Sequence, residues 1–196
     1  MKDAPRLTIV GGPNGAGKST LTRTAGLRGH LIDPDAIAKA INPADPESAS
    51  LTAGREALRR SDVYISKRLD FVQESTLSGG SALRLIDRAK AAGYEVDLRY
   101  VGVPASEVAQ ARVAERVASG GHNIPVEDID RRFRRSLAAL PRALAIVDTA
   151  TLYDNGGDQQ HRIVAELRAG VVVWHAPELP QWVDRVLGGL LKAGRR

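Results

Sequence analysis

One segment near the start of the chain, residues 12–19, constrains the fold more than any other. It reads GPNGAGKS, with glycines at 12, 15 and 17 followed by a lysine and a serine. The segment comes after the apolar run of residues 7–10 and before residues that favour a helix. Glycine permits a tight turn there because it adopts backbone angles that other residues avoid. The sequence therefore predicts a strand–loop–helix unit.

The pattern G-x-x-x-x-G-K-[ST] in this setting is typical of a loop that binds phosphate groups, or P-loop. Its backbone N–H groups point inward, and the following helix adds the positive end of its dipole. We expect Lys18 to reach the β and γ phosphates of ATP and Ser19 to bind Mg²⁺. The alternative is a glycine-rich turn with a chance lysine. The predicted nucleotide-binding residues are Gly12, Pro13, Asn14, Gly15, Ala16, Gly17, Lys18, Ser19 and Thr20.

Apolar runs and helical spacing alternate along the rest of the chain, which favours an α/β fold with a mainly parallel central sheet flanked by helices, of the P-loop NTPase type. With 196 residues, one domain spanning residues 1–196 is expected. Residues 42–50 are predicted to form a surface loop. Strands are predicted at residues 7–10, 31–32, 71–72, 96–103 and 171–174, and helices at 53–69, 82–92, 106–119, 126–140 and 177–196.

Composition narrows the possible partners and compartments. The net charge of +5 would suit nucleic acid, but aromatic residues make up only 4% and do not alternate with basic ones, so nucleic acid is not expected. The absence of cysteine excludes disulfides and cysteine-based metal sites. No apolar run approaches the ~20 residues of a membrane span, and no signal peptide is recognisable. We expect a cytoplasmic protein without a membrane partner.

Two aspartates follow the second predicted strand. Asp33 and Asp35 lie in the segment LIDPD, where the carboxyl end of a parallel strand opens onto the phosphate site. Either carboxylate could accept the proton of an attacking hydroxyl or position that hydroxyl in line with the γ-phosphate. Either could instead cap the helix that begins near residue 36. The sequence leaves both roles open.

Glu74 and Thr76 follow the third predicted strand in the segment QESTLSGG. They are expected at the same edge of the sheet, where a turn rich in hydroxyl groups can hold a polar acceptor. The competing interpretation is a helix cap, with Ser78 or Ser81 starting the next helix.

Residues 106–140 are predicted to form an arginine-rich helical hairpin after the fourth strand. Arginines in such a lid can stabilise the charge that develops during phosphoryl transfer. Arg112 and Arg116 are four residues apart and share a helix face, whereas Arg131 and Arg132 point in different directions, so at most one of that pair reaches the site. His122 follows two glycines that could turn it toward the cleft.

Six segments together resemble the zeta toxin family in order and spacing. They are GGPNGAGKST, DPDAIA, ESTLSG, RVAERVASGGHNIP, RRFRRSL and YDN. The resemblance covers residues 6–156. It implies an ATP-dependent kinase that phosphorylates the 3′-hydroxyl of the sugar in UDP-N-acetylglucosamine, and a small helical antitoxin as a possible partner.

The resemblance also implies roles for individual residues. Asp35 matches the family's catalytic aspartate, and Glu74 and Thr76 match its substrate-binding pair. Arg112 or Arg116 matches an arginine that bridges the phosphates. The expected catalytic residues are thus Lys18, Asp35, Arg112 and Arg116, and the expected substrate-binding residues are Asp33, Glu74, Thr76, His122 and Arg132.

Two other functions remain compatible with the sequence. The first is a P-loop kinase of a different hydroxyl acceptor, such as a nucleotide, an antibiotic or a polynucleotide end. The second is a nucleotide-dependent binding switch, in which ATP orders the hairpin to dock a partner. The basic C-terminal tip with Lys192, Arg195 and Arg196 favours the switch.

Overall fold

The computed structural model describes residues 4–120, 124–157 and 161–193. Its strands form one sheet in the order β2-β3-β1-β4-β5-β6-β7, in which β1 to β5 run parallel and β6 and β7 are antiparallel to their neighbours. This confirms the predicted α/β fold with a mainly parallel sheet. The strands are β1 (Arg6–Gly11), β2 (His30–Ile32), β3 (Phe71–Ser75), β4 (Glu95–Gly102), β5 (Thr149–Asp154), β6 (Arg162–Arg168) and β7 (Val171–His175).

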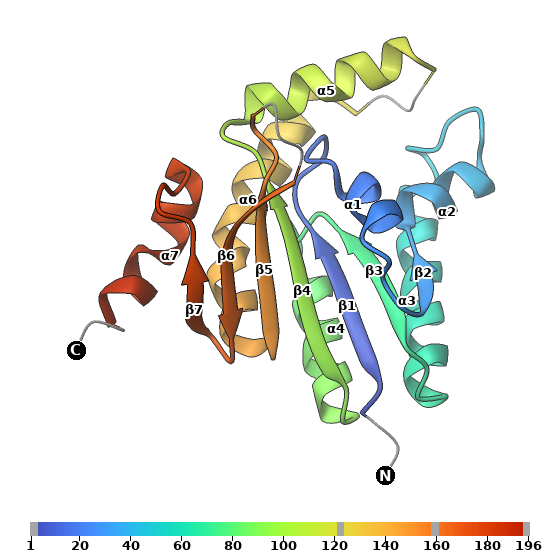
Figure 1. The fold of residues 1–196 in the computed structure, drawn as a ribbon. Coiled ribbons are helices and arrows are strands. Elements are labelled where there is room, and N and C mark those ends of the chain that lie inside the picture. The colour runs from blue at the N-terminus through green and yellow to red at the C-terminus, as the bar shows by residue number, and fades with distance from the viewer. Residues whose placement is uncertain (1–3, 121–123, 158–160, 194–196) are drawn as a thin grey trace.

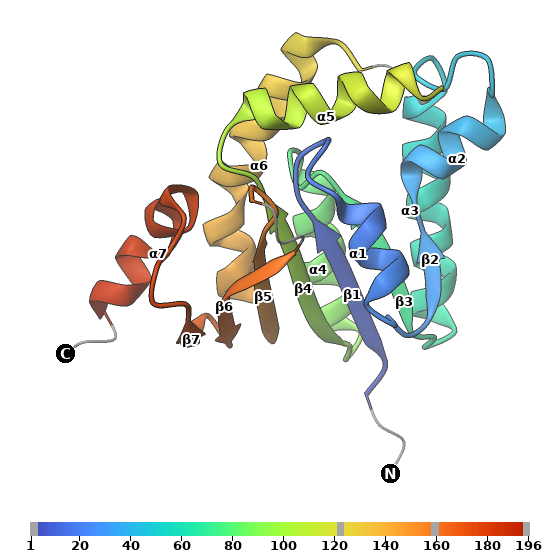
Figure 2. The same ribbon diagram turned by 45° about the horizontal axis from the view of Figure 1, so that its top comes forward.

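Helices flank the sheet unequally (Figure 1). In that view α3, α4 and α6 lie behind the sheet, α1 lies in front of β1 and β3, and α5 crosses the upper end of the sheet, as Figure 2 also shows. Helix α7 contacts α6 and β7. The helices are α1 (Lys18–Thr24), α2 (Pro34–Ile41), α3 (Ser50–Ser66), α4 (Gly80–Ala91), α5 (Ser106–Ala118), α6 (Val126–Ile146) and α7 (Gln181–Ala193).

Two hydrophobic cores form because alternate residues of a strand face opposite sides of the sheet. Leu7 and Ile9 of β1 belong to the larger core, which includes buried residues of α3, α4, α6 and α7. Val10 belongs to the smaller core, where it joins Leu21 of α1 and Val113 of α5. The smaller core thus fixes α1 and α5 at the carboxyl end of the parallel strands.

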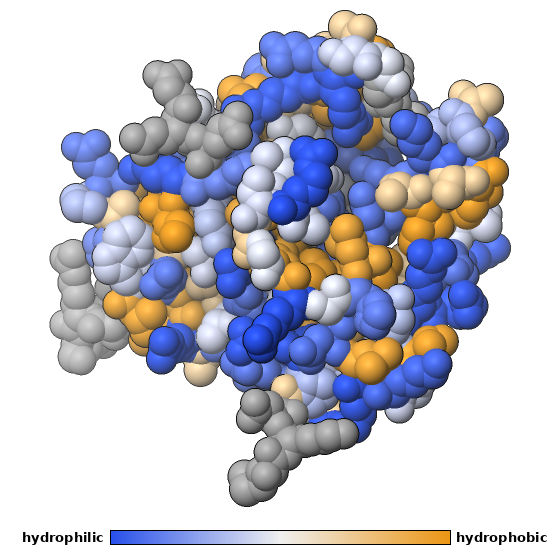
Figure 3. All heavy atoms as spheres, turned by 45° about the vertical axis from the view of Figure 1, so that its right-hand side comes forward, coloured by the Kyte–Doolittle hydropathy of each residue, from blue (hydrophilic) through white to orange (hydrophobic). Residues whose placement is uncertain are grey.

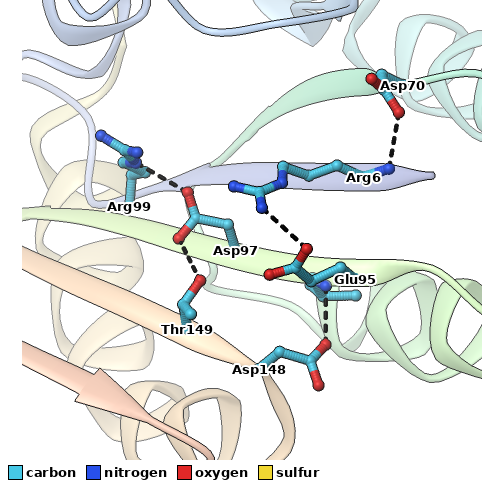
Figure 4. A network of polar contacts seen from close by, with 8 residues as sticks. Arg6, Asp70, Glu95, Asp97, Arg99, Asp148 and Thr149 are labelled. Atoms are coloured by element: carbon cyan, nitrogen blue, oxygen red, sulfur yellow. Dashed lines mark hydrogen bonds and ion pairs between the residues drawn. The ribbon is translucent and has the colours of Figure 1, made fainter. Parts of the chain in front are cut away.

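A polar network occupies part of the sheet at β1, β4 and β5 (Figure 4). Asp97 accepts hydrogen bonds from Arg99 Nε at 2.9 Å and from Thr149 Oγ1 at 2.8 Å. Arg6 pairs with Glu95 at 2.9 Å. These side chains satisfy one another across neighbouring strands, so this part of the sheet carries polar rather than apolar packing.

Large exposed apolar side chains lie at or near the two edges of the sheet. Leu31 of the edge strand β2 is 48% exposed and Ile41 of α2 is 47% exposed, and Figure 3 shows apolar surface among hydrophilic side chains on that side of the molecule. Val171 and Trp174 of the opposite edge strand β7 are also exposed. Other exposed apolar side chains, Leu51 of α3, Val126 of α6 and Ile163 of β6, lie outside the two edge strands.

Several boundaries differ from those predicted. Strands β5 and β6 were not foreseen, and α6 continues through Pro141 to Ile146 rather than ending at residue 140. Proline removes one helix hydrogen bond, but Leu140 and Leu144 are fully buried against the sheet, and their burial keeps the helix continuous. Helix α3 begins at Ser50, three residues before its predicted start.

The predicted hairpin is divided between two environments. Helix α5 and the first turns of α6, including Ile129, belong to the smaller core, whereas Leu140, Ala143 and Leu144 of α6 belong to the larger core. Only α5 and the beginning of α6 therefore lie near the carboxyl end of the sheet. The helix predicted at residues 177–196 is α7, and its residues Trp182 and Val183 are buried. None of the helices in the described ranges is both long and apolar enough to cross a membrane.

Candidate active site

The loop between β1 and α1 depends on glycine for two reasons. Gly12, Gly15 and Gly17 have φ angles of 144°, 73° and 98°, which side chains on the α-carbon disfavour. A Cβ atom on Gly12 would also lie 2.3 Å from the Val101 carbonyl oxygen, and one on Gly15 would lie 2.4 Å from that of Ala109. The glycines thus let the loop fold tightly and lie directly against β4 and α5.

A cleft of about 510 Å³ lies over this loop. Six of the nine predicted nucleotide-binding residues line it. The other three, Gly12, Pro13 and Ala16, are buried and do not line the cleft. Arg112 and Arg116 of α5 add positive charge to its lining. The lining consists of Asn14, Gly15, Gly17, Lys18, Ser19, Thr20, Arg23, Asp35, Glu74, Arg112, Glu115, Arg116, Asn155 and His161.

Lys18 belongs to the P-loop and lines the cleft. Its Nζ donates a hydrogen bond to the Pro13 carbonyl oxygen at 3.0 Å. Burial lowers the pKa of Lys18, while the nearby carboxylates of Asp35 and Glu74 act in the opposite direction. A poorly solvated ammonium group gains from an anion placed beside it, so this position suits a phosphate group.

A second cavity, of about 380 Å³, adjoins the cleft. We call it the acceptor pocket. It shares Lys18, Asp35 and Glu74 with the cleft. Its remaining lining comes from α2, α3, β3, α4 and α6: Asp33, Pro34, Ser50, Leu51, Gly54, Arg55, Ala57, Leu58, Gln73, Ser75, Thr76, Ser81 and Arg132. The three shared side chains mark the place where the two cavities meet.

The two aspartates after β2 have different positions. Asp33 caps α2, since its carboxylate accepts hydrogen bonds from the backbone N–H groups of Asp35 at 2.9 Å and Ala36 at 3.2 Å. Burial raises the pKa of Asp33. Asp35 lies in the first turn of α2 and lines both cavities. Of the two roles left open by the sequence, the cap belongs to Asp33, and Asp35 faces the site.

Glu74 lines the acceptor pocket and also contacts the residue that follows Lys18 of the P-loop. Its Oε2 accepts a hydrogen bond from Ser19 Oγ at 2.9 Å, and its buried Oε1 has no hydrogen-bond partner among the described residues. Burial, followed by the charge of Asp33, raises the pKa of Glu74. A buried carboxylate oxygen without a partner is costly. A hydroxyl and a carboxylate together offer the oxygen ligands that Mg²⁺ prefers, so the pair fits this ion.

Thr76 lines the acceptor pocket, and its Oγ1 is 2.7 Å from Ser78 Oγ. The expectation that Ser78 or Ser81 caps the following helix is wrong. Helix α4 is capped by Gly79, without a side-chain hydrogen bond, because Ser78 pairs with Thr76 and Ser81 already lies inside the first turn. Of these residues, Thr76 and Ser81 line the pocket.

The lid arginines separate into two sets. Arg112 and Arg116 of α5 line the cleft, and Nη1 of Arg112 is buried without a hydrogen-bond partner in the described part of the chain. Arg132 of α6 lines the acceptor pocket, and its Nη1 lies 3.5 Å from Asn14 Oδ1. Arg131 points away, with its side chain 51% exposed and paired with Asp128 at 2.8 Å. As their spacing predicts, one of the two neighbouring arginines reaches the site.

Four lining residues of the cleft, Arg23, Glu115, Asn155 and His161, were not predicted from the sequence. Asn155 and His161 line it from the loop after β5 and approach the carbonyl oxygens of Ala16 and Gly17. The segment YDN drew attention to Asn155 without giving it a role, and the sequence holds no comparable signal for His161. His122, predicted to bind substrate, lies outside the described residues.

The sequence matches the family model described as zeta toxin over residues 1–163. An uncharacterized protein of Haemophilus influenzae is 40% identical over 123 residues, which make up 62% of this chain and 88% of that protein. The family match thus includes both cavities, from the P-loop to His161.

Solved structures share the fold at low sequence identity. One, of the PezAT chromosomal toxin–antitoxin system of Streptococcus pneumoniae, has a TM-score of 0.62 and 17% identity, covering 96% of this chain and 79% of that chain. Another, AvrRxo1-ORF1:-ORF2 with ATP, has a TM-score of 0.69 and 17% identity, covering 95% and 63%. A putative kinase from Chloroflexus aurantiacus has a TM-score of 0.54 and 22% identity, covering 68% and 80%. These likenesses concern the fold.

Family and fold agree with the geometry of the site. The mostly parallel sheet flanked by helices is an α/β arrangement shared with the structural neighbours. The family match supports an ATP-dependent kinase or phosphotransferase. Because that match extends over most of the chain, the protein belongs to the zeta toxin family.

Proposed function

We propose that the protein transfers the γ-phosphate of ATP to a sugar hydroxyl, and that its acceptor is the 3′-hydroxyl of UDP-N-acetylglucosamine. The observation that carries this proposal is the meeting of the two cavities at Lys18, Asp35 and Glu74. A hydroxyl in the acceptor pocket can thereby be held next to a phosphate on the P-loop. Such positioning supplies a large part of the rate enhancement in phosphoryl transfer.

The cleft is suited to the triphosphate of ATP. The P-loop offers backbone N–H groups, and Lys18 offers a poorly solvated positive charge. Arg112 approaches from α5 with a buried nitrogen that has no hydrogen-bond partner among the described residues and that a phosphate oxygen would satisfy. With Arg116 on the same side of the cleft, these groups stabilise the negative charge on the transferring phosphoryl group.

Ser19 and Glu74 would hold Mg²⁺. Bound there, the ion would neutralise charge on the β and γ phosphates. The fit rests on the hydroxyl–carboxylate pair at 2.9 Å and on the second oxygen of Glu74, which has no hydrogen-bond partner in the described part of the chain. Mg²⁺ commonly takes one or two protein ligands and completes its shell with phosphates and water. The two side chains therefore provide what the protein itself must contribute.

Asp35 would act on the acceptor hydroxyl. As the hydroxyl oxygen forms its bond to the γ-phosphorus, the bond to the bridging oxygen breaks, ADP leaves, and the hydroxyl proton passes to the Asp35 carboxylate. Asp33 is less suited to this step because its carboxylate is engaged in capping α2. Asp33 instead lines the acceptor pocket, where we place it among the substrate-binding residues.

The acceptor pocket can recognise both parts of a nucleotide sugar. Glu74 and Thr76 can bind sugar hydroxyls, while Arg132 and Arg55 can pair with a diphosphate. Leu58 adds apolar surface for a ring. An acceptor that combines hydroxyl groups with negative charge fits this lining better than a neutral sugar does.

We also propose a cytoplasmic protein that inhibits growth and is controlled by a small helical antitoxin. A UDP-activated amino sugar and ATP are both cytoplasmic compounds, which is the reason for the compartment. Support for a protein partner comes from the resemblance in fold to a structure of the PezAT toxin–antitoxin system. Expression of the chain with and without its neighbouring genes, with growth as the readout, tests this part.

The decisive experiment is mass spectrometry of acceptors incubated with the protein, ATP and Mg²⁺. The panel includes UDP-N-acetylglucosamine, other UDP-sugars, nucleotides, and RNA and DNA ends, and the Lys18→Ala variant is the control. We expect UDP-N-acetylglucosamine to gain one phosphate with the wild type and none with the variant. Phosphate on a different acceptor would support the kinase activity but refute UDP-N-acetylglucosamine as the acceptor. ATP binding without any product would favour the nucleotide-dependent switch.

A further inference from the structure

The side chain of Asn155 lies behind the P-loop. The residue directly follows β5 and is only 6% exposed. Its backbone N–H donates to the Gly102 carbonyl at 2.9 Å, which fixes it to the end of β4. Its Nδ2 donates to the Ala16 carbonyl oxygen at 2.8 Å. A rigid part of the sheet thus contacts the loop backbone through one buried amide.

His161 makes the neighbouring contact. Its Nε2 lies 3.0 Å from the Gly17 carbonyl oxygen. A carbonyl can only accept, so the bond requires the proton on Nε2. The same oxygen also accepts the helix bond from Leu21 N–H at 3.1 Å, which its two lone pairs allow. The backbone N–H of His161 donates to Asn155 Oδ1 at 3.4 Å, which joins the His161 main chain to the Asn155 side chain.

Gly17 makes this approach possible. A Cβ atom at this position would lie 2.6 Å from Asn155 Nδ2 and 3.1 Å from His161 Nε2. Any larger residue would displace one or both side chains. The glycine of the P-loop is therefore required by contacts with the loop after β5, in addition to its φ angle of 98°.

The two hydrogen bonds determine which way the loop's N–H groups point. A trans peptide unit is planar, so its C=O and N–H groups point in opposite directions. Holding the Ala16 carbonyl toward Asn155 turns the Gly17 N–H the other way. Holding the Gly17 carbonyl toward His161 and Leu21 turns the Lys18 N–H away from those two residues. These are the donors that a P-loop presents to phosphates.

We propose that Asn155 and His161 are positioning residues that orient the peptide groups of the P-loop for ATP and so set its affinity. They act through the Ala16 and Gly17 carbonyls. The inference rests on the proposed binding of ATP by the loop. It gives a role to the last residue of the YDN segment and to a histidine that is 144 residues away from Gly17 in the sequence.

The test measures the dissociation constant of Mg-ATP by calorimetry, together with the unfolding midpoint. Asn155→Leu removes the amide at similar size, and we expect binding about tenfold weaker, since one buried hydrogen bond is lost. Thr149→Val is the matched control, because it removes a 2.8 Å hydrogen bond at the other end of β5. Its ATP affinity should stay within about twofold of the wild type.

His161 offers an independent test with a conservative rescue. His161→Leu should weaken ATP binding about tenfold, whereas His161→Gln keeps an N–H donor and should recover most of the affinity. This pair decides the outcome if Asn155→Leu does not fold. Equal affinities for the leucine and glutamine variants would show that the ring only fills space and would overturn the proposal.

Comparison with Lys18→Ala separates this inference from the proposed function. If Lys18→Ala loses ATP while Asn155→Leu and His161→Leu bind like the wild type, the positioning role is wrong and the kinase stands. If Thr149→Val weakens ATP binding equally, the weaker binding reflects a general loss of protein stability, and the positioning role is also refuted. If the wild type itself does not bind ATP, both proposals fail.

Discussion

The phosphate side and the acceptor side of the active site are built in different ways. Six residues that line the nucleotide cleft come from one short run, residues 14–20, between β1 and α1. The acceptor pocket is assembled from side chains of α2, α3, β3, α4 and α6, which extend from Asp33 to Arg132. The phosphate side is therefore built around one continuous loop, which distant side chains such as Arg112 and Asn155 complete, whereas the acceptor side has no such continuous segment.

This difference reflects how each side recognises its ligand. Phosphates are bound largely by backbone N–H groups, whose directions depend on glycine and on local geometry. A sugar or nucleotide acceptor is recognised by side chains that converge from several elements. The phosphate side can therefore be recognised from a short sequence motif. The acceptor side, in contrast, can change through single substitutions far apart in the sequence.

Lys18→Ala removes a residue that both sides share, and we expect the largest effect. ATP binding and phosphate transfer should both fall below detection, because the charge that faces the phosphates is lost. Calorimetry with Mg-ATP and a transfer assay measure the two losses. Lys39→Ala, on the exposed side of α2, is the matched control and should leave both unchanged. If Lys18→Ala still binds ATP, Lys18 is not required on the phosphate side, and the proposed sharing of this residue between the two sides is wrong.

Asp35→Asn should affect transfer far more than ATP binding. Transfer is expected to fall about 10²- to 10⁴-fold because the general base is lost, whereas the ATP dissociation constant should change little because the P-loop is intact. Asp33→Asn is the control, because asparagine caps helices as well as aspartate does. Single-turnover rates and ATP titrations separate the effects. A larger loss of transfer in Asp33→Asn would exchange the roles assigned to these two residues.

Arg132→Ala should raise the KM for the acceptor about tenfold, because one charge-assisted hydrogen bond in the pocket is lost. Arg131→Ala, which removes an exposed neighbour on the same helix, should have no measurable effect. Initial rates at varied acceptor concentration provide the measurement. Similar KM values for the two variants would show that Arg132 does not bind the acceptor.

Glu74→Gln should give the smallest change, a gain in stability at pH 8. Burial raises the pKa of Glu74 above its ordinary value of 4.5, so the folded protein binds this proton more tightly than the unfolded chain does. The resulting cost is complete above the raised pKa and absent below about 4.5. Glutamine removes it, and we expect an unfolding midpoint about 2–4 °C higher at pH 8.

Thermal melts between pH 4 and pH 8 test this sign. The advantage of Glu74→Gln should shrink as the pH falls toward 4, where Glu74 is protonated in both states. Transfer by the same variant should be slower, since a neutral amide binds Mg²⁺ less well than a carboxylate. A stability difference that does not depend on pH would mean that packing, rather than charge, is responsible.

Predictions from the sequence were most successful where the signal was local. The strand β1, the glycines of the loop and the start of α1 all follow from adjacent residues. The end of α6 was missed because burial of Leu144 outweighs the local effect of Pro141. Strand β5 was missed because its sequence TATLYD is a weak strand pattern by itself. Its pairing with β4 and β6 is what stabilises it.

The sequence by itself determined the P-loop, the mainly parallel α/β fold and the set of carboxylates and arginines available to the site. Only the tertiary structure decided that Asp33 caps α2 while Asp35 faces both cavities, that Glu74 pairs with Ser19, and that Asn155 and His161 hold the loop. The physical reason is the range of the interactions. Backbone conformation is governed by neighbouring residues, whereas side-chain contacts such as Asn155 to Ala16 join residues 139 positions apart and exist only when the sheet has formed.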